Sequence, residues 1–336
     1  MILVTGGLGY VGSHTIVELL NANYEVVCID NLYNSRIETK SKIEEITKKN
    51  FKFHNIDINN FELLNECVNS YENIKAVIHF AAYKSVPESI SNPIKYYQNN
   101  IGTLLNILKI TSLRGLNLVF SSSCIVYGDG NSSPLREGDM VSTPLCAYGA
   151  SKKYCEEILL DYTNSSTSKV ASLRYFNPAG AHSSNLIGED PLFNTVTLIP
   201  ALVRSALDDS LLLTVNGADY PTIDGTCIRD FIHVSDVALA HLSALKYLFN
   251  EKSDKFSVFN IGRGEGTTIL QLIDLFQETS GKRPRFILGP RRQGDIVESW
   301  ANCSKSNKVL NWKSIYSLSD ILKTSFNWEK YKFERT

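Results

Sequence analysis

The sequence predicts an α/β fold, a doubly wound parallel sheet with a smaller lobe in the C-terminal half. First, short apolar runs alternate with helical patterns through the first half of the chain. Second, these runs are almost continuously hydrophobic, as strands covered on both faces must be. Third, the rhythm changes after about residue 177, where turn-rich stretches such as NGADYPTIDGT separate shorter elements.

Six segments are predicted to be strands of this sheet. They are ILVT at 2–5, EVVCID at 25–30, FKFHNI at 51–56, AVIHFA at 76–81, LNLVFS at 116–121 and KVASLRY at 169–175. Segments with helical patterns, such as YVGSHTIVELLNAN and NIGTLLNILKITSL, connect them. We expect residues 1–176, with a returning segment near 230–262, to form one domain, and 177–336 mainly a second lobe across a cleft.

Composition narrows the classes of partner. The 336 residues carry a net charge of −1, which gives no electrostatic reason to expect nucleic acid or an anionic membrane as a partner. No apolar run approaches the roughly 20 residues of a membrane helix, and the chain opens directly on a strand, so we expect no signal peptide. The seven cysteines lack a CxxC pair, which favours reduced thiols of a cytoplasmic protein and predicts no metal site.

A glycine-rich turn links the first strand to the first helix. The stretch VTGGLGYVG spaces Gly6, Gly9 and Gly12 so that backbone N–H groups at a helix N-terminus can approach a pyrophosphate. Asp30 ends the second strand about 20 residues on, where a carboxylate binds ribose hydroxyls and repels a 2′-phosphate. A purely structural turn is the alternative. The context favours a Rossmann-type domain that binds NAD in preference to NADP.

The stretch LCAYGASKKYCEE, residues 145 to 157, holds two tyrosines and two lysines at the predicted start of a helix. Residues four apart share a helical face, so Tyr148 and Lys152 can act together. Lys153 is rotated off that face, and Tyr154 has no lysine four residues away on either side. Alone, the pair would suggest a solvated lysine beside a half-buried tyrosine. The upstream glycine turn, and a serine cluster where the fifth strand ends, favour a catalytic pair instead.

Several motifs occur together through most of the chain: HFAAYKSVPES with YYQNN, SSSCIVYGD, YGASK, LRYFNPAGAH, GEDP, DYPTIDGTCIRDFIHVSD and RRQGDI. Together they resemble the UDP-hexose 4-epimerases of the extended short-chain dehydrogenase/reductase family. The combination is far more specific than any single motif. The resemblance implies an NAD-dependent isomerase that is a homodimer and epimerises UDP-hexoses at C4 through a transient 4-keto sugar.

The resemblance also implies roles for individual residues. Tyr148 would remove the proton of the sugar 4-hydroxyl while C4 gives a hydride to NAD⁺, and the ketone would take it back on its other face. Lys152 would hold the nicotinamide ribose and stabilise the phenolate, and Ser123 would hydrogen-bond the 4-oxygen. The other implied cofactor contacts are Gly6, Gly9, Tyr10, Val11, Gly12, Asp30, Asn31, Asp57, Ile58, Phe80, Ala81, Lys84, Asn99 and Tyr175.

In the second lobe, the resemblance implies that Arg229 and Arg292 bind the diphosphate. The alternative for GPRRQGD is a solvated basic turn, which is what we expect of Arg291. Two guanidinium forks suit a diphosphate, and Asp295 can accept bonds from the uridine ribose. The further implied substrate contacts are Lys84, Ser123, Tyr148, Asn177, Thr197, Leu198, Asn216 and Ser299. Two stretches depart from the usual pattern: Val196-Thr197-Leu198 replaces a common Asn-Asn-Leu, and Asn216 stands where an aromatic ring often packs on uracil.

Ser299 occupies the position that resembles the gate of the family's sugar pocket. A tyrosine there narrows the pocket, whereas a small residue leaves room for a 2-acetamido group. Ser299, with Thr197 opposite, therefore suggests that UDP-GlcNAc and UDP-GalNAc are also interconverted. The alternative is that other walls close the space.

Related chemistries leave two alternatives to epimerisation. Relatives that dehydrate or decarboxylate nucleotide sugars carry an acid–base carboxylate where this chain has Cys124 and Ile125, neither of which exchanges protons as a carboxylate would. A nucleotide-sugar dehydrogenase that releases NADH is the enzymatic alternative, and a non-catalytic NAD-sensing protein is the other.

The tyrosine must also be acidic enough to act as a base. Its ordinary pKa is about 10, and a base near neutrality needs a drop of roughly 3 units. One nearby cation supplies about 1–3 units, and burial of the phenolate opposes it. We therefore expect Tyr148 to be more acidic with NAD⁺ than with NADH, because Lys152 alone is marginal.

Overall fold

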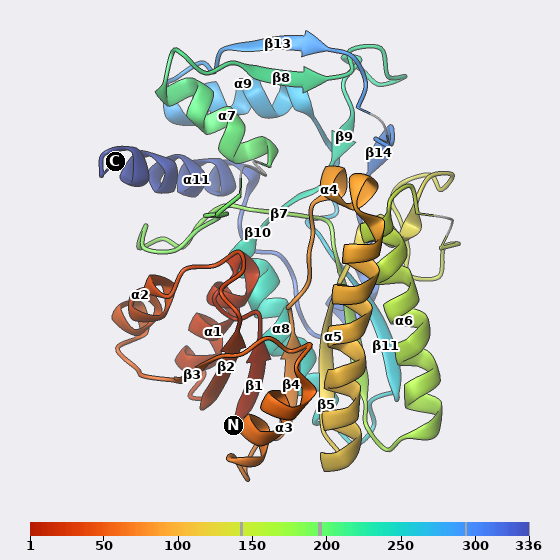
Figure 1. The fold of residues 1–336 in the computed structure, drawn as a ribbon. Coiled ribbons are helices and arrows are strands. Elements are labelled where there is room, and N and C mark those ends of the chain that lie inside the picture. Colours follow the sequence, from red (N-terminus) through yellow and green to blue (C-terminus); the bar gives the residue numbers. More distant parts are fainter. Residues whose placement is uncertain (142–143, 194–196, 293, 336) are drawn as a thin grey trace.

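The apolar runs of the N-terminal half form a parallel sheet whose central strands are buried (Figure 1). The structure, a computed structural model, describes residues 1–141, 144–193, 197–292 and 294–335. Within them the sheet has seven strands in the order β11-β6-β5-β4-β1-β2-β3. Their bounds are β1 Ile2–Thr5, β2 Val26–Asp30, β3 Lys52–Asn55, β4 Ala76–His79, β5 Asn117–Ser123, β6 Val170–Tyr175 and β11 Phe256–Ile261. The predicted fold class is confirmed, and all six predicted segments are strands.

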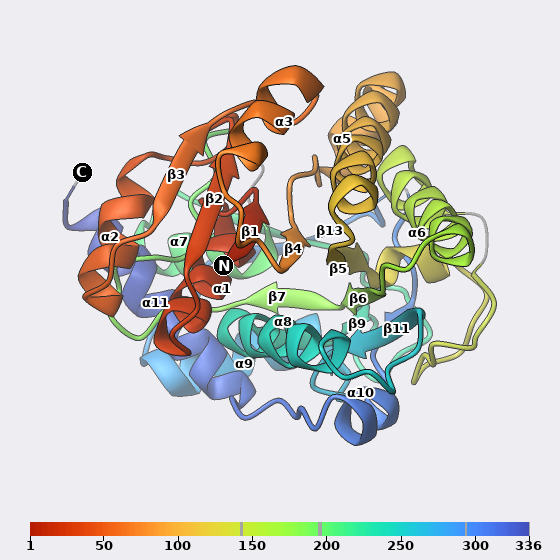
Figure 2. The ribbon, with the colours of Figure 1, turned by 90° about the horizontal axis from the view of Figure 1, so that it is seen from below.

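Helices cover both faces of the sheet, which explains its continuous hydrophobicity (Figure 2). They are α1 Tyr10–Asn21, α2 Glu38–Thr47, α3 Phe61–Asn69, α5 Pro93–Arg114, α6 Ala147–Ser165 and α8 Val234–Leu248, while the short α4 Val86–Ser91 packs against α5 and α6. Val4 and Cys28 share a hydrophobic cluster with α1 and α8 on one face. Leu3 and Val27, their neighbours along the strands, share another cluster with α3, α5 and α6. Alternate residues of one strand thus need apolar side chains for opposite faces.

The chain returns to this sheet after passing through the second lobe. β7 (Asn177–Ala179) pairs with β10 (Phe231–His233), α8 packs on α1, and β11 adds a strand beside β6. β10, α8 and β11 lie in the segment predicted to return, although β11 itself is not among the six predicted strands. The domain boundary at residue 176 stays a prediction.

The second lobe has a hydrophobic cluster of its own, which includes Leu202, Phe276 and Ile321. Its elements are α7 Leu198–Leu207, β8 Leu213–Asn216, β9 Ile228–Arg229, β12 Thr267–Thr268, α9 Ile269–Ser280, β13 Phe286–Gly289, β14 Glu298–Ser299 and α11 Leu318–Phe333. β8 pairs with β13, and β9 lies between β12 and β14. Two short helices, η1 Cys124–Tyr127 and α10 Ser304–Val309, complete the described elements. Among these helices none is both long and apolar enough to span a bilayer.

Candidate active site

A cavity of about 1250 Å³ lies between the carboxyl ends of the sheet strands and the second lobe. It sits where β1 meets β2 on one side and β4 on the other, the switch point at which open α/β sheets bind ligands. Every residue predicted to bind cofactor or substrate, or to act in catalysis, lines this cavity. Val196, named above for its departure from the family pattern, lies outside the described residues.

The glycine turn after β1 is shaped for close packing and for an anion. Gly6 has a φ of +67°, and a Cβ there would lie 2.7 Å from the backbone nitrogen of Ala81. A Cβ on Gly12 would lie 2.4 Å from the Gly6 carbonyl oxygen. Gly9 caps α1 without a side-chain bond, and the first N–H groups of that helix have no intrahelical acceptor. The turn therefore presents unpaired donors at the cavity wall, as a diphosphate site requires.

Asp30 organises the wall beside this turn. One carboxylate oxygen accepts a bond from the Leu8 N–H at 3.0 Å, and the other accepts from the Leu32 N–H at 2.9 Å and the Ser35 hydroxyl at 2.8 Å. Asp30 is buried but still lines the cavity, and a carboxylate has about four lone-pair sites, so capacity remains for a ribose hydroxyl.

Two more of the predicted cofactor residues meet on the same wall, where the Asn31 amide donates to the Asp57 carboxylate at 3.3 Å. Asp57 lies near Asp30 along the edge of the cavity, so two carboxylates line this part of the site. Their negative charge disfavours a 2′-phosphate, and the wall fits NAD rather than NADP.

Helix α6 places Tyr148 and Lys152 on the cavity wall. The Cys146 sulfur caps this helix by accepting the Gly149 N–H, so Tyr148 lies in the first turn. Lys152 is buried, and its ammonium donates to the Ser121 carbonyl at 2.6 Å. By contrast, Lys153 pairs with Glu157 at 4.0 Å on the outer side. The helical phase inferred from the sequence thus separates the two lysines.

Burial dominates the protonation of this pair. It raises the pKa of Tyr148 to about 12, although a hydrogen bond with Ser123 acts in the opposite direction. Burial also lowers the pKa of Lys152 to about 8, while Cys155 and Glu156 oppose that shift. At neutral pH the resting pair is therefore a neutral phenol and an ammonium, and Tyr148 needs further positive charge before it becomes a base.

Asp295 joins the two arginines predicted to bind the diphosphate. One of its oxygens accepts from Arg229 at 3.1 Å and from Arg292 at 2.9 Å. Sharing one carboxylate holds both guanidinium groups on the same wall and leaves other N–H donors of each available. The Asn177 amide, also on this wall, donates to the Asp230 carbonyl at 3.0 Å.

Arg291 is exposed, in agreement with the prediction of a solvated arginine, but it also has partners of its own. Its guanidinium pairs with the Asp219 carboxylate at 2.7 Å and lies 4.2 Å from the centre of the Tyr220 ring. These partners belong to the turn-rich stretch at 216–226, some 70 residues away in sequence, so local sequence could not reveal the contact. Arg291 therefore contacts the turn at 216–226, and it does not line the cavity.

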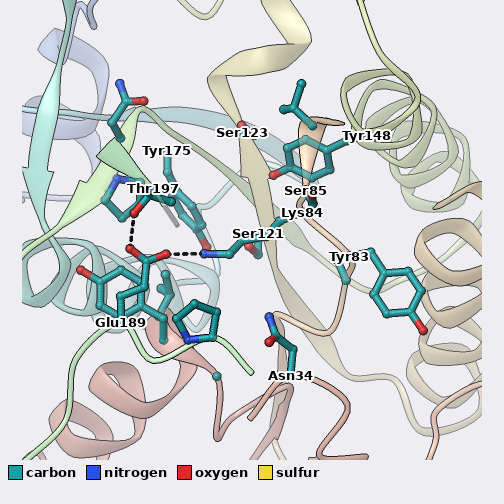
Figure 3. A pocket seen from close by; sticks show the side chains of 18 of the residues that line it. Asn34, Tyr83, Lys84, Ser85, Ser121, Ser123, Tyr148, Tyr175, Glu189 and Thr197 are labelled. Carbon is teal, nitrogen blue, oxygen red and sulfur yellow. Dashed lines mark hydrogen bonds and ion pairs between the residues drawn. The ribbon is translucent and has the colours of Figure 1, made fainter. Parts of the chain in front are cut away.

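Glu189 is a cavity residue to which the sequence reasoning assigned no role. Its carboxylate accepts from the Lys84 ammonium at 3.0 Å and from the Thr197 hydroxyl at 2.5 Å (Figure 3). Lys84 follows β4, whereas Glu189 and Thr197 belong to the second lobe, so this contact joins the two walls of the cavity. The motif GEDP was the available signal, but its partner lies 105 residues away.

Ser299 is buried on β14 and shares a hydrogen bond with the Cys124 thiol. Burial raises the pKa of Cys124 to about 11, so this thiol stays protonated at neutral pH and is no ready nucleophile. Both residues line the cavity, and their small side chains leave that wall open. Groups of His, Cys, Asp or Glu arranged to hold a metal ion do not occur among the residues that the structure describes.

The model of the NAD dependent epimerase/dehydratase family matches residues 2–262. The chain is 42% identical over 330 residues to the UDP-glucose 4-epimerase of Dictyostelium discoideum, covering 98% of this chain and 95% of that protein. It is 44% identical over 334 residues to the bifunctional protein GAL10 of Pachysolen tannophilus; this match covers 97% of the chain but only 48% of that protein's length.

A solved structure has the same architecture. It is the UDP-glucose-4-epimerase of Stenotrophomonas maltophila with bound NAD and formylated UDP-arabinopyranose. The TM-score is 0.95 at 38% identity, and the match covers 100% of this chain and 99% of that one.

Proposed function

The chain belongs to the NAD dependent epimerase/dehydratase family, and on that premise we propose that it is a UDP-hexose 4-epimerase that interconverts UDP-glucose and UDP-galactose. One observation carries this proposal: Ser123, Tyr148 and Lys152 face the same cavity as the glycine turn and the Arg229–Asp295–Arg292 group. A hydride-transfer site and a diphosphate-sugar site thus share one space.

NAD fits the first half of the cavity. The donors of the glycine turn would hold its diphosphate, Asp30 its adenosine ribose, and Asp57 with Ile58 the adenine pocket. Lys84, Asn99 and Lys152 would contact its other phosphate and ribose groups. When bound, NAD⁺ supplies a hydride acceptor for C4 of the sugar and afterwards returns that hydride. The positive charge of its nicotinamide ring also favours the phenolate form of a nearby tyrosine.

The reaction then requires three actions from this chain. Tyr148 accepts the proton of the sugar 4-hydroxyl and later returns it, Ser123 hydrogen-bonds the 4-oxygen, and Lys152 stabilises the phenolate with its ammonium charge. Arg229 and Arg292 hold the diphosphate at the far end, so that the sugar can turn over in the cavity without release. Nothing in this scheme needs a carboxylate at Cys124 or Ile125.

An equilibrium assay separates the proposal from its alternatives. UDP-glucose, UDP-galactose, UDP-GlcNAc and UDP-GalNAc are each incubated with the protein, first without and then with added NAD⁺, and the isomers are resolved chromatographically. Conversion without net NADH supports the epimerase. Net formation of NADH indicates the dehydrogenase, and an unchanged sugar with retained NAD indicates the sensor.

We also propose that the acetylated pair, UDP-GlcNAc and UDP-GalNAc, are substrates. Ser299 and Cys124 are small, and Thr197 is shorter than the family's asparagine, so these three cavity residues would leave room for a 2-acetamido group. Ser299 is only 3% exposed and lines the cavity. In Ser299→Tyr the cavity is therefore the space into which the larger side chain would extend.

Ser299→Tyr is therefore expected to lower kcat/KM for the acetylated pair by about 100-fold, equivalent to roughly 2.7 kcal/mol, with less than a threefold change for UDP-galactose. Ser299→Ala is the matched control and should spare both pairs. If kcat/KM for both pairs falls by the same factor in Ser299→Tyr, Ser299 is not the gate.

We further propose a cytoplasmic homodimer whose subunits meet through α5 and α6. These helices pack side by side, and Tyr97 and Tyr154 contact each other across them, 6.2 Å between ring centres. Ile94, Leu113 and Leu160 are large apolar side chains left exposed on the same two helices. Light scattering should give twice the 37.6 kDa chain mass. Leu113→Lys with Leu160→Lys should shift it to a single chain, and a monomeric wild-type protein would refute the proposal.

A further inference from the structure

Three side chains, each one helical turn after the last, fix α6 to strand β5. Tyr148, Lys152 and Glu156 follow the i, i+4, i+8 spacing of one helical face. Tyr148 hydrogen-bonds Ser123, and Lys152 donates to the carbonyl of Ser121 at 2.6 Å. The third side chain, Glu156, accepts the hydroxyl of the intervening residue, Ser122, at 2.6 Å. Three neighbouring β5 residues, Ser121 to Ser123, thus contact three turns of α6, and of the three α6 side chains Glu156 does not line the cavity.

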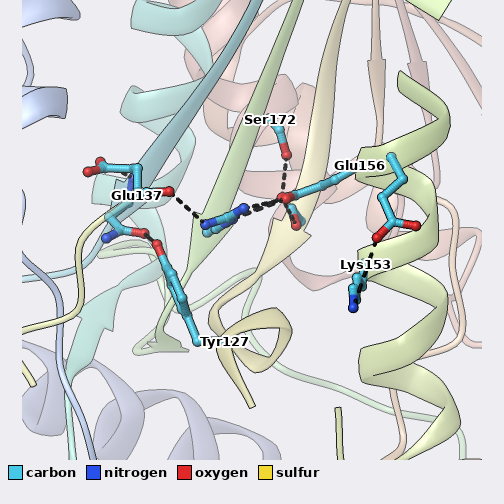
Figure 4. Close-up of polar contacts among 9 residues, drawn as sticks. Tyr127, Glu137, Lys153, Glu156 and Ser172 are labelled. Atoms are coloured by element: carbon cyan, nitrogen blue, oxygen red, sulfur yellow. Dashed lines mark hydrogen bonds and ion pairs between the residues drawn. The ribbon is translucent and has the colours of Figure 1, made fainter. Parts of the chain in front are cut away.

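Glu156 is the centre of a buried polar cluster (Figure 4). Besides Ser122, its Oε1 accepts the hydroxyl of Ser172 at 2.8 Å, and its Oε2 accepts the Arg174 Nη2 at 2.6 Å. Arg174 is held in turn by the Tyr127 ring, whose centre lies 4.7 Å from the guanidinium carbon. Glu156 is 7% exposed and Arg174 4%, and among the described ion pairs theirs alone has both side chains below 10% exposure.

A buried ion pair of this kind is weak evidence for stability. Removing two charges from water costs several kcal/mol per ion, and well-packed apolar residues often replace such pairs without loss. The cluster reaches the cavity only through Ser122, and neither Glu156 nor Arg174 lines it, so the ion pair does not bind a ligand directly. The contacts of Glu156 and Arg174 act instead on the side chains packed around them.

Lys152 is the neighbour whose charge Glu156 can influence. On α6 it is faced by Tyr148, Cys155 and Glu156, and from β4 by the imidazole of His79. Burial lowers the pKa of His79 to about 3 and raises that of Cys155 to about 12, so both are neutral at working pH. Burial also keeps the phenol of Tyr175 on β6 neutral, by raising its pKa. Glu156 is thus the carboxylate among these groups, and its partner Arg174 on β6 is the nearby cation.

We propose that Glu156, paired with Arg174, is a positioning residue for the reaction: it fixes the register of α6 on β5 and keeps Lys152 charged beside Tyr148. The inference rests on the proposed function, because the charge on Lys152 matters only if Tyr148 acts as a base. It assigns no contact with substrate to Glu156.

Opposite charge changes in the cluster provide the test. Glu156→Gln removes the carboxylate and leaves Arg174 unpaired, so Lys152 loses its proton more readily. The alkaline limb of the pH profile of kcat should move down by about one pH unit, with KM changed less than threefold. Arg174→Met leaves the carboxylate beside Lys152. The alkaline limb of its kcat profile should therefore stay in place or move to higher pH. Ser172→Ala, which removes one hydrogen bond but no charge, should leave the limb in place.

A titration without cofactor separates this inference from the proposed function. Protein stripped of nucleotide and labelled with [¹³Cε]lysine gives a Lys152 signal, assigned by its loss in Lys152→Arg. The signal should titrate about one pH unit lower in Glu156→Gln than in the wild type and unshifted in Ser172→Ala. This readout holds even if the wild type fails to epimerise UDP-hexoses, a failure that would refute the proposed function alone.

Some outcomes would overturn the inference. One is a Lys152 titration in Glu156→Gln that coincides with the wild type. Another is an alkaline limb of the kcat profile that moves to lower pH in both Glu156→Gln and Arg174→Met. A shift in the same direction would indicate a general loss of packing and not an effect of charge. If Glu156→Gln does not fold, the double variant Glu156→Gln/Arg174→Met removes both charges. Because Glu156, and not Arg174, raises the pKa of Lys152, a Lys152 titration in it that coincides with the wild type would equally contradict the role of Glu156.

Discussion

Tyr148→Phe is expected to lower kcat for the conversion of UDP-galactose by roughly 10²- to 10⁴-fold, the usual loss when a general acid–base group is removed. The ring still fills its buried site, and only the hydroxyl that meets Ser123 is lost. NAD and UDP-sugar affinity should therefore change little, so that the loss appears in kcat and not in KM. Single-turnover absorbance at 340 nm should show no transient reduction of the cofactor.

Tyr154→Phe is the matched control for that variant. Tyr154 lies on the same helix, but its side chain is 46% exposed and contacts Tyr97. Its loss of a hydroxyl should leave kcat within twofold. Equal loss in both variants would show that the helix, and not one phenol, is sensitive to substitution.

A titration of the Tyr148 phenol tests in which direction bound NAD⁺ changes its pKa. The difference in absorbance near 295 nm between wild type and Tyr148→Phe isolates this one group. Burial raises its pKa to about 12 in the resting site, and a positive nicotinamide ring should lower it. A pKa that is equal with NAD⁺ and NADH would count against the mechanism.

Lys152→Met is expected to lower kcat by roughly 10²-fold or more and yet to raise the stability of the nucleotide-free protein. Methionine keeps the apolar stem in its buried position but removes the charge that stabilises the phenolate. Burial lowers the pKa of Lys152 from 10.5 to about 8, so below pH 8 the folded state carries a charge that burial disfavours. At 1.36 kcal/mol per unit, its removal should stabilise the fold by roughly 3 kcal/mol at pH 7.

The direction of the pH effect follows from the same shift. The unfolded chain holds the Lys152 proton up to its ordinary pKa, whereas the folded chain releases it near pH 8, so wild-type stability should rise between about pH 8 and 10.5 relative to Lys152→Met. Urea unfolding at pH 7 and pH 9.5 measures both values. Lys153→Met is the control, because it alters only a partly exposed pair with Glu157. Its free energy of unfolding should stay within about 1 kcal/mol of the wild-type value, and its kcat should be unchanged. A destabilised Lys152→Met protein would contradict the assignment.

Much of the fold could be predicted because burial on two faces leaves a simple pattern. Val4 and Leu3 must both be apolar, since one meets α1 and the other meets α5. β11 escaped prediction because Ser257 and Asn260 interrupt its hydrophobic run. Both are buried, and each is hydrogen-bonded: Ser257 to Tyr247 and Asn260 to Tyr127.

The comparisons confirm the predicted α/β fold, NAD dependence and 4-epimerase class. Helical spacing was enough to choose Tyr148 and Lys152, because both members of the pair lie within one turn of each other. The Lys84–Glu189 and Arg291–Asp219 pairs were beyond reach, because each joins segments 72 or more residues apart that only the folded chain brings together. The Glu156–Arg174 pair spans only 18 residues, but it too was not predicted, because no motif links the two elements that hold it.

The central claim is that the hydride removed from C4 returns to the same carbon before anything leaves the site. The most direct measurement uses UDP-galactose carrying deuterium at C4, with wild-type protein and NAD⁺ in ordinary water. Mass spectrometry and NMR of the UDP-glucose formed should show the deuterium still on C4, with no label in free NADH. Loss of the deuterium to water, or its appearance in released cofactor with an accumulating ketone, would contradict the account.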